Sequence, residues 1–167
     1  VANLDSAVGI TMADQWRLSA QIDPAGANQE TIIDSNLEQV DDATFANIGS
    51  SMTQTSGEFS FPETGLYLVQ YTIGMVASNN TNNRYFYSYI AASTDSGSNY
   101  DNVAGTLNSV PNSDASTEFG TTTNTVFINV TNASTHRVRF SIATDNSSSN
   151  INGETAQNMT HFTFIRL

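Results

Sequence analysis

The feature that most constrains this chain is a break between two strand patterns within residues 57–76. A short candidate strand at residues 58–61 runs into Pro62, and a long one, residues 66–76, starts just after Gly65. Proline removes a backbone N–H that a sheet would use, and glycine accepts the backbone angles of a tight corner. The segment therefore predicts two strands joined by a sharp turn.

The long strand has two unlike faces, because successive side chains of a strand point to opposite sides. One set is apolar throughout and predicts a domain core: Tyr67, Val69, Tyr71, Ile73 and Met75. The other set is half apolar and half small or amide-bearing: Leu66, Leu68, Gln70, Thr72 and Gly74. Such a mixture suits burial against another protein surface, so the sequence predicts an oligomer.

Composition excludes several classes of partner. The chain of 167 residues carries a formal net charge of −11 and contains no lysine, which disfavours binding to nucleic acid. No apolar run approaches the roughly 18 residues that a membrane span needs, so no membrane insertion is expected. The absence of cysteine excludes disulfides and favours a microbial or viral source over a small secreted eukaryotic domain.

The rest of the chain repeats strand patterns between polar loops. Candidate strands lie at residues 15–22, 31–33, 37–40, 45–48, 52–55, 84–92, 103–110, 117–130, 137–143 and 159–167. Residues 1–13 lack such a pattern and predict an N-terminal arm, and residues 145–157 predict the longest loop. No segment has a helical period. The sequence therefore predicts an all-β antiparallel sandwich over residues 14–167.

Three motifs support a more specific fold. Phe59-x-Phe-Pro-x-x-Gly65-x-Tyr67 resembles the motif that opens the long strand in the tumour necrosis factor (TNF) and complement-q globular-head superfamily. Residues 161–167, His-Phe-Thr-Phe-Ile-Arg-Leu, are similar to that superfamily's last strand. Residues 126–130 and 137–140 resemble its penultimate pair, although 131–135 replace the usual Gly-Asp turn. The resemblance implies a TNF-like jelly roll of about ten strands that assembles as a homotrimer.

In that superfamily the inner sheet faces a threefold axis. The resemblance implies that the following side chains line the trimer axis: Leu68, Gln70, Thr72, Thr122, Asn124, His161, Ile165 and Leu167. Their polar members would bond to one another or to water, because buried polar groups need partners. The alternative, that these are ordinary wetted strand residues of a monomer, stays open.

The sequence supports no catalytic or metal site. Only His136 and His161 could serve a Ser-His-Asp arrangement, and no Gly-x-Ser-x-Gly motif is present. Glu38, Asp41 and Asp42 form the densest acidic cluster, without the Asp-x-Asp-x-Asp-Gly pattern of a calcium loop. We therefore expect no catalytic residues, no metal and no cofactor, and interpret the cluster as solvated charge.

A row of tyrosines is the second candidate surface. Tyr85, Tyr87 and Tyr89 alternate with Phe86, Ser88 and Ile90 along one strand. If the second set fills the core, the tyrosines point outward and offer rigid contact area to a protein or sugar partner. The opposite register would bury them. Both registers stay open.

These features favour a non-enzymatic homotrimeric protein on the surface of a bacteriophage virion, outside the cell. It would act as a capsid decoration and stabilising protein, its arm docking on the capsid, or as an adhesive head for host glycan or protein. The alternatives are the receptor-binding tip of a tail fibre and a secreted or spore-surface complement-like head. A glycan hydrolase on a β scaffold is a third class.

Overall fold

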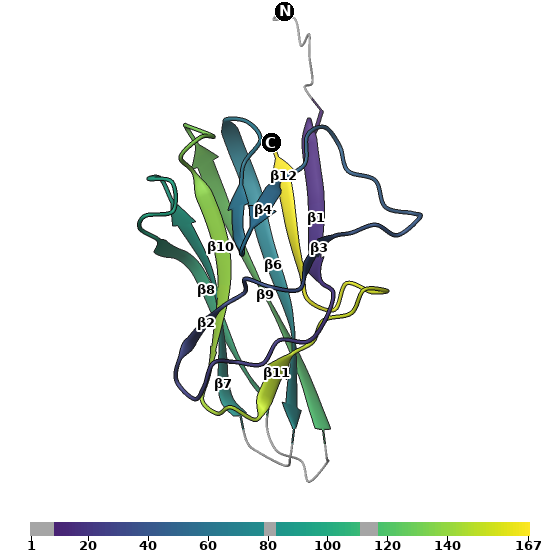
Figure 1. Cartoon of the computed structure of the whole chain (residues 1–167), viewed down its shortest axis with the longest axis vertical. Helices are drawn as coiled ribbons and strands as arrows, with labels where there is room; N and C mark the ends of the chain where they lie inside the picture. Colours follow the sequence, from purple (N-terminus) through teal and green to yellow (C-terminus); the bar gives the residue numbers. More distant parts are fainter. Residues whose placement is uncertain (1–8, 79–82, 111–116) are drawn as a thin grey trace, which may run out of the picture.

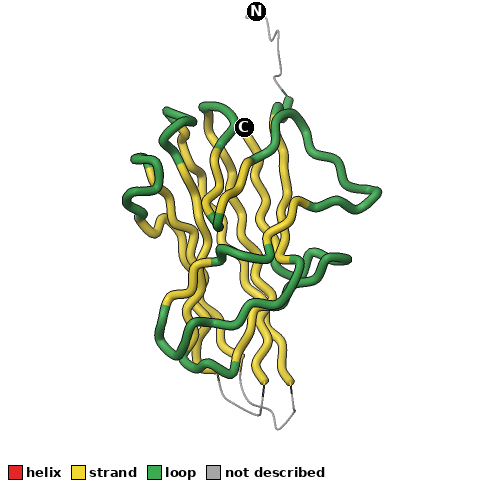
Figure 2. Tube along the Cα trace, in the orientation of Figure 1, coloured by secondary structure: helices red, strands yellow, loops and turns green. Residues whose placement is uncertain are grey.

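The computed structural model describes residues 9–78, 83–110 and 117–167, and these form strands and loops (Figure 2). The strands are β1 (Met12–Leu18), β2 (Glu30–Ile32), β3 (Leu37–Gln39), β4 (Thr53–Thr55), β5 (Glu58–Ser60), β6 (Gly65–Ser78), β7 (Asn83–Ser93), β8 (Asp101–Val110), β9 (Thr117–Val130), β10 (Arg137–Thr144), β11 (Ser149–Ile151) and β12 (His161–Arg166). Across these described residues, no helix is long and apolar enough to cross a membrane.

The strands build two antiparallel sheets that face each other (Figure 1). Sheet A runs β3-β1-β12-β6, with β9 on the free side of β6 and β11 paired to the far end of β6. Sheet B runs β4-β5-β10-β7-β8, with β2 beside β10. The predicted all-β antiparallel sandwich is confirmed.

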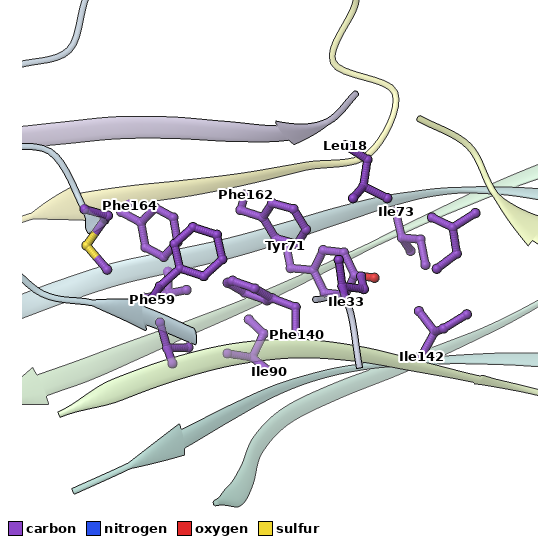
Figure 3. Close-up of a cluster of buried hydrophobic side chains, with 14 of the residues drawn as sticks. Leu18, Ile33, Phe59, Tyr71, Ile73, Ile90, Phe140, Ile142, Phe162 and Phe164 are labelled. Carbon is purple, nitrogen blue, oxygen red and sulfur yellow. The ribbon is translucent and has the colours of Figure 1, made fainter. Parts of the chain in front are cut away.

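Aromatic rings fill the space between the sheets (Figure 3). Phe140 of sheet B lies 4.4 Å, between ring centroids, from Phe162 of sheet A, which stacks on Tyr71 at 5.1 Å. Phe59 joins this cluster from β5 and is fully buried. Truncating one such ring to alanine costs about 3–5 kcal/mol of stability. The apolar set predicted for residues 67–75 is the core face of β6.

The corner before β6 has the predicted form. β5 ends at Ser60 and β6 begins at Gly65, where φ is +150° and a Cβ atom would lie 2.6 Å from Nε of Arg166. The Tyr67 hydroxyl donates a 2.9 Å hydrogen bond back to the Glu63 carbonyl. A side chain at position 65 would thus displace the Arg166 side chain and adopt a backbone angle that favours glycine.

The edges of the two sheets meet along β8 and β9. Thr106 and Thr122 share a hydrogen bond with 2.8 Å between their hydroxyl oxygens. Nearby, the Asn108 side-chain amide donates to the Thr121 carbonyl at 2.8 Å. Side chains, rather than a backbone ladder, therefore close this side of the sandwich.

Most strand bounds differ from the prediction by a few residues, and three differences change an element. β1 begins at Met12, so it takes in the last two residues of the expected arm, whose residues 1–8 lie outside the described part. Residues 45–48 add only one bridge, between Ile48 and Ala13. The expected loop at 145–157 contains β11, because its residues pair with the long β6 beyond the end of β12.

Candidate functional site

The outer face of sheet A, which points away from sheet B, carries an exposed apolar row. Leu68 lies between Phe127 of β9 and Ile165 of β12 in the register of the sheet. Leu66 and Leu167 extend the row at its end, and Phe127 and Leu167 are 61% and 63% exposed. Exposed large apolar side chains in one patch indicate an interaction surface. The apolar row is defined as these five residues.

A polar belt crosses the same face next to the apolar row. It consists of Gln15, Gln70, Thr72, Thr123, Thr125 and Thr163. The Thr72 and Thr123 hydroxyls share a 3.0 Å hydrogen bond, and the Gln15 amide donates to the Thr163 hydroxyl at 2.9 Å. The belt thus satisfies part of its own hydrogen-bonding capacity before any other surface covers it.

Beyond the polar belt the face is hollowed by a pocket of about 440 Å³. Its lining is Thr72, Gly74, Met75, Phe119, Gly120, Thr121, Asn152, Asn158 and Met159. Phe119 is 72% exposed and stands at the rim with Met159. Gly74 leaves the floor open, and a Cβ atom there would lie 3.1 Å from the Met159 carbonyl oxygen. A glycine inside a strand marks such a close approach.

His161 lies at the boundary between the polar belt and the β1 strand. It stands opposite Thr72 on one side and Arg17 on the other, and its Nδ1 atom is 3.1 Å from the Asn158 carbonyl oxygen. Burial lowers the pKa of the imidazole, and the Asn158 contact opposes this shift in part. His161 is therefore held toward its neutral form.

Two of the predicted axis residues are on the other face. Thr122 and Asn124 stand opposite Ile73 and Tyr71, whose side chains point into the core. Asn124 is buried, and its amide donates to the carbonyl and the hydroxyl of Ser88 at 2.7 and 2.8 Å. The prediction that they share a face with Leu68 is wrong, because the register of β9 is shifted by one residue from the expected one.

The register places other β9 side chains on the outer face of sheet A. They are Phe119, Thr121, Thr123, Thr125 and Phe127. The sequence prediction missed Phe119 and Phe127 in β9, and also Met159 at the pocket. A usable signal was present: Val126, Ile128 and Val130 alternate as a core set, which fixes Phe127 on the opposite side. Leu68, Gln70, Thr72, His161 and Ile165 lie on the predicted face, and their axial role stays a prediction.

The acidic cluster is an ion-pair network rather than solvated charge. Arg17, only 1% exposed, contacts Glu38 through Nε at 2.7 Å, Asp41 through Nη2 at 2.7 Å and Asp42 through Nη1 at 2.6 Å. The hydrogen bond to Glu38 is the main cause that raises the pKa of Arg17. This network covers the β1 side of sheet A with the protomer's own residues.

The tyrosine row, Tyr85, Tyr87 and Tyr89, points outward from sheet B. Phe86, Ser88 and Ile90 are fully buried on the core side. Ring centroids are 5.1 Å apart for Tyr85 and Tyr87 and 5.7 Å apart for Tyr87 and Tyr89. The structure thus selects one of the two registers that the sequence left open.

Metal ligation finds no support in this part of the molecule. Among residues 9–78, 83–110 and 117–167, no three histidine or carboxylate side chains gather where they could hold a metal ion. The groups described above on the two outer faces are mainly apolar, hydroxyl and amide groups. What they offer chemically is contact area and hydrogen bonds.

Comparison with solved structures defines the class of fold. Three crystal structures of murine APRIL, a TNF-family jelly-roll protein, match 93% of this chain and 98% of theirs. The structures at pH 5.0, 8.5 and 8.0 give TM-scores of 0.61, 0.57 and 0.57 at 10%, 9% and 10% sequence identity. No protein-family model and no curated protein sequence matches. The chain therefore has the TNF-like jelly-roll fold that its motifs predicted.

Proposed function

We propose that this chain is a non-enzymatic module that assembles as a homotrimer through the outer face of sheet A. The observation that carries the proposal is the apolar row at one end of this face, together with the exposed Phe119 and Met159 at the other end. Leucine, isoleucine and phenylalanine side chains gain about 1.5–3 kcal/mol each when they are fully buried. Burying them against other copies of the same face gives a closed symmetric assembly.

The polar belt supports assembly in one register. Its Thr72–Thr123 and Gln15–Thr163 hydrogen bonds lie between the apolar row and the pocket. Copies that associate out of register would bury hydroxyl and amide groups against apolar side chains, which costs free energy. The belt thus favours one alignment of the copies on a face that is apolar at both ends.

The first test is the mass of the protein in solution. Static light scattering should give three times the 18.0 kDa of one chain. A mass of one chain at concentrations well above the micromolar range would contradict the proposal. A mass of two chains would retain the interface and reject the threefold symmetry.

We further propose that the trimer is carried on the surface of a bacteriophage virion as a capsid decoration protein or adhesive head. The supports are the TNF-like fold, the acidic lysine-free composition and the absence of cysteine. Mass spectrometry of virions purified from the phage that encodes the chain should detect it. Antibody labelling would then separate head from tail, and absence from the particle would favour a secreted or spore-surface protein.

A further inference from the structure

We infer that the tyrosine row on sheet B is a binding surface for an uncharged polysaccharide. The inference rests on the proposed function, because it requires a module whose sheet A face is covered by its own copies while sheet B stays exposed. Its parts are Tyr85, Tyr87 and Tyr89, together with the polar groups on their border.

The three rings are held in place before any ligand arrives. The Tyr87 and Tyr89 rings are nearly parallel, with 7° between their planes, and the Tyr85 hydroxyl donates a hydrogen bond to Asn28. Tyr89 lies over Gly105, where a Cβ atom would be 3.1 Å from the ring. A surface that is already ordered loses little conformational entropy on binding.

Two hydroxyls of the row remain available to a ligand. Among the residues that the structure describes, the Tyr87 and Tyr89 hydroxyls make no hydrogen bond, in contrast to that of Tyr85. Burial raises the pKa of Tyr89, so its phenol stays protonated at neutral pH. A neutral phenol both donates and accepts, which matches the hydroxyl groups of a sugar.

The border of the row adds acceptors, and the arginines on it already contact groups of the protomer. Arg139 on β10, opposite Ala91, lies 3.9 Å over the Tyr100 ring. Glu30 accepts a 2.5 Å hydrogen bond from Ser141, which lies opposite Tyr89 on β10. Arg84, next to Tyr85, is bonded to Asp145 at 2.7 Å. With a net charge of −11 on the chain, this border repels nucleic acid and anionic polysaccharides. An uncharged polymer meets no such barrier.

A sugar fits the row better than an apolar protein surface does. An apolar partner would bury the Tyr87 and Tyr89 hydroxyls and the Glu30 carboxylate without giving them partners. A pyranose ring has apolar C–H faces for the phenol rings and hydroxyls at its edge for the polar groups. Alternate side chains of a strand repeat every ~6.6 Å, which is comparable to one sugar unit of an extended chain.

Affinity electrophoresis tests the inference. The protein is run in native gels that contain dextran, mannan or galactan, with alginate as the anionic polymer. We expect retardation by at least one uncharged polysaccharide and none by alginate. Tyr87→Ala should bind at least about tenfold more weakly, as expected for a residue central to a contact. Tyr87→Phe, which keeps the ring and loses the hydroxyl, should bind with intermediate strength.

Ile48→Ala is the matched control, since Ile48 is exposed and pairs with Ala13 of sheet A, away from the tyrosine row on sheet B. It should be retarded like the original protein. Thermal unfolding checks that each variant is folded. Equal retardation of Tyr87→Ala, or retardation by alginate alone, would overturn the inference.

Light scattering on the same samples separates this inference from the proposed trimer. A trimer that no uncharged polysaccharide retards would reject the tyrosine site and keep the trimer. A monomer that is retarded, and loses this with Tyr87→Ala, would reject the trimer and keep the site. A monomer without retardation would reject both.

Discussion

The outer faces of sheet A and sheet B expose different kinds of side chain to water. The outer face of sheet A exposes Leu66, Phe127 and Leu167, which have no polar atoms in their side chains. Sheet B exposes Leu107 and Val103 as well, but it also carries tyrosines, whose rings already contact one another and whose hydroxyls can bond to water. Under the proposed function, the first face is covered by other copies of the chain, whereas the second stays in contact with water and accessible to a ligand.

The largest expected effect is that of a charge placed in the apolar row. Leu68→Asp puts a carboxylate between Phe127 and Ile165, and its desolvation in an interface costs several kcal/mol. Light scattering should therefore report single chains. The matched control is Leu107→Asp on sheet B, where Leu107 is 57% exposed, and it should leave the mass unchanged. A trimer that survives Leu68→Asp would assign the interface to another face.

The next effect concerns the β1 side of sheet A, where the ion pairs of Arg17 cover the sheet with residues of the same chain. Arg17→Met leaves Glu38, Asp41 and Asp42 together without their cation. Because these carboxylates are partly exposed, we expect a loss of about 2–3 kcal/mol in the free energy of unfolding, below the range for fully buried pairs. Urea unfolding measures it. Arg17→Lys should lose less stability. A loss under ~0.5 kcal/mol for Arg17→Met would show that the ion-pair network contributes little to the free energy of unfolding.

A smaller effect tests whether the tyrosine row depends on the strand beneath it. Gly105→Val places a branched side chain under the Tyr89 ring, where even a Cβ atom would come within 3.1 Å. The ring must move, so the near-ultraviolet circular dichroism of the tyrosines should change. Stability should shift by less than ~1 kcal/mol, because valine favours strands. The mass in solution should stay constant. An unchanged spectrum would show that the position of the Tyr89 ring does not depend on residue 105.

The smallest effect is a pH dependence confined to sheet A. Burial lowers the pKa of His161 in the folded chain below its ordinary value of 6.5. The unfolded chain therefore binds more protons as the pH falls through 6.5, and the free energy of unfolding decreases. Urea unfolding at about pH 7.5 and about pH 5.5 should show this decrease, and His161→Gln should reduce it. An equal decrease in both proteins would place the titration elsewhere.

The sequence predicted the regions where apolar and polar residues alternate clearly. The two faces of β6 and the corner at Pro62 and Gly65 lie as expected, because hydropathy and backbone chemistry agree there. β9 failed at Thr122 and Asn124, because the threonine run itself has no hydropathic contrast and the alternation of Val126, Ile128 and Val130 was not carried back along the strand. Likewise Tyr85–Ile90 is apolar on both sides, and only the pairing with β10 decides which side faces the core.

Other parts of the site depend on contacts between distant residues. Arg17 meets carboxylates 21 to 25 residues further along the chain, and no local pattern indicates that they converge. β11 lies in a Ser- and Asn-rich run and exists because the long β6 continues past β12. The pocket at Met159 likewise needs the loop before β12 to fold against Gly74.

The side-chain closure between β8 and β9 limits how copies of this chain can grow into larger structures. An open strand edge can recruit a further strand indefinitely, which is the route to fibrils. Here Thr106 to Thr122 and Asn108 to Thr121 already tie these two edges together. Strand addition is thereby hindered at these two edges. If copies associate around a threefold axis through the outer face of sheet A, as proposed, growth stops when the ring of three closes.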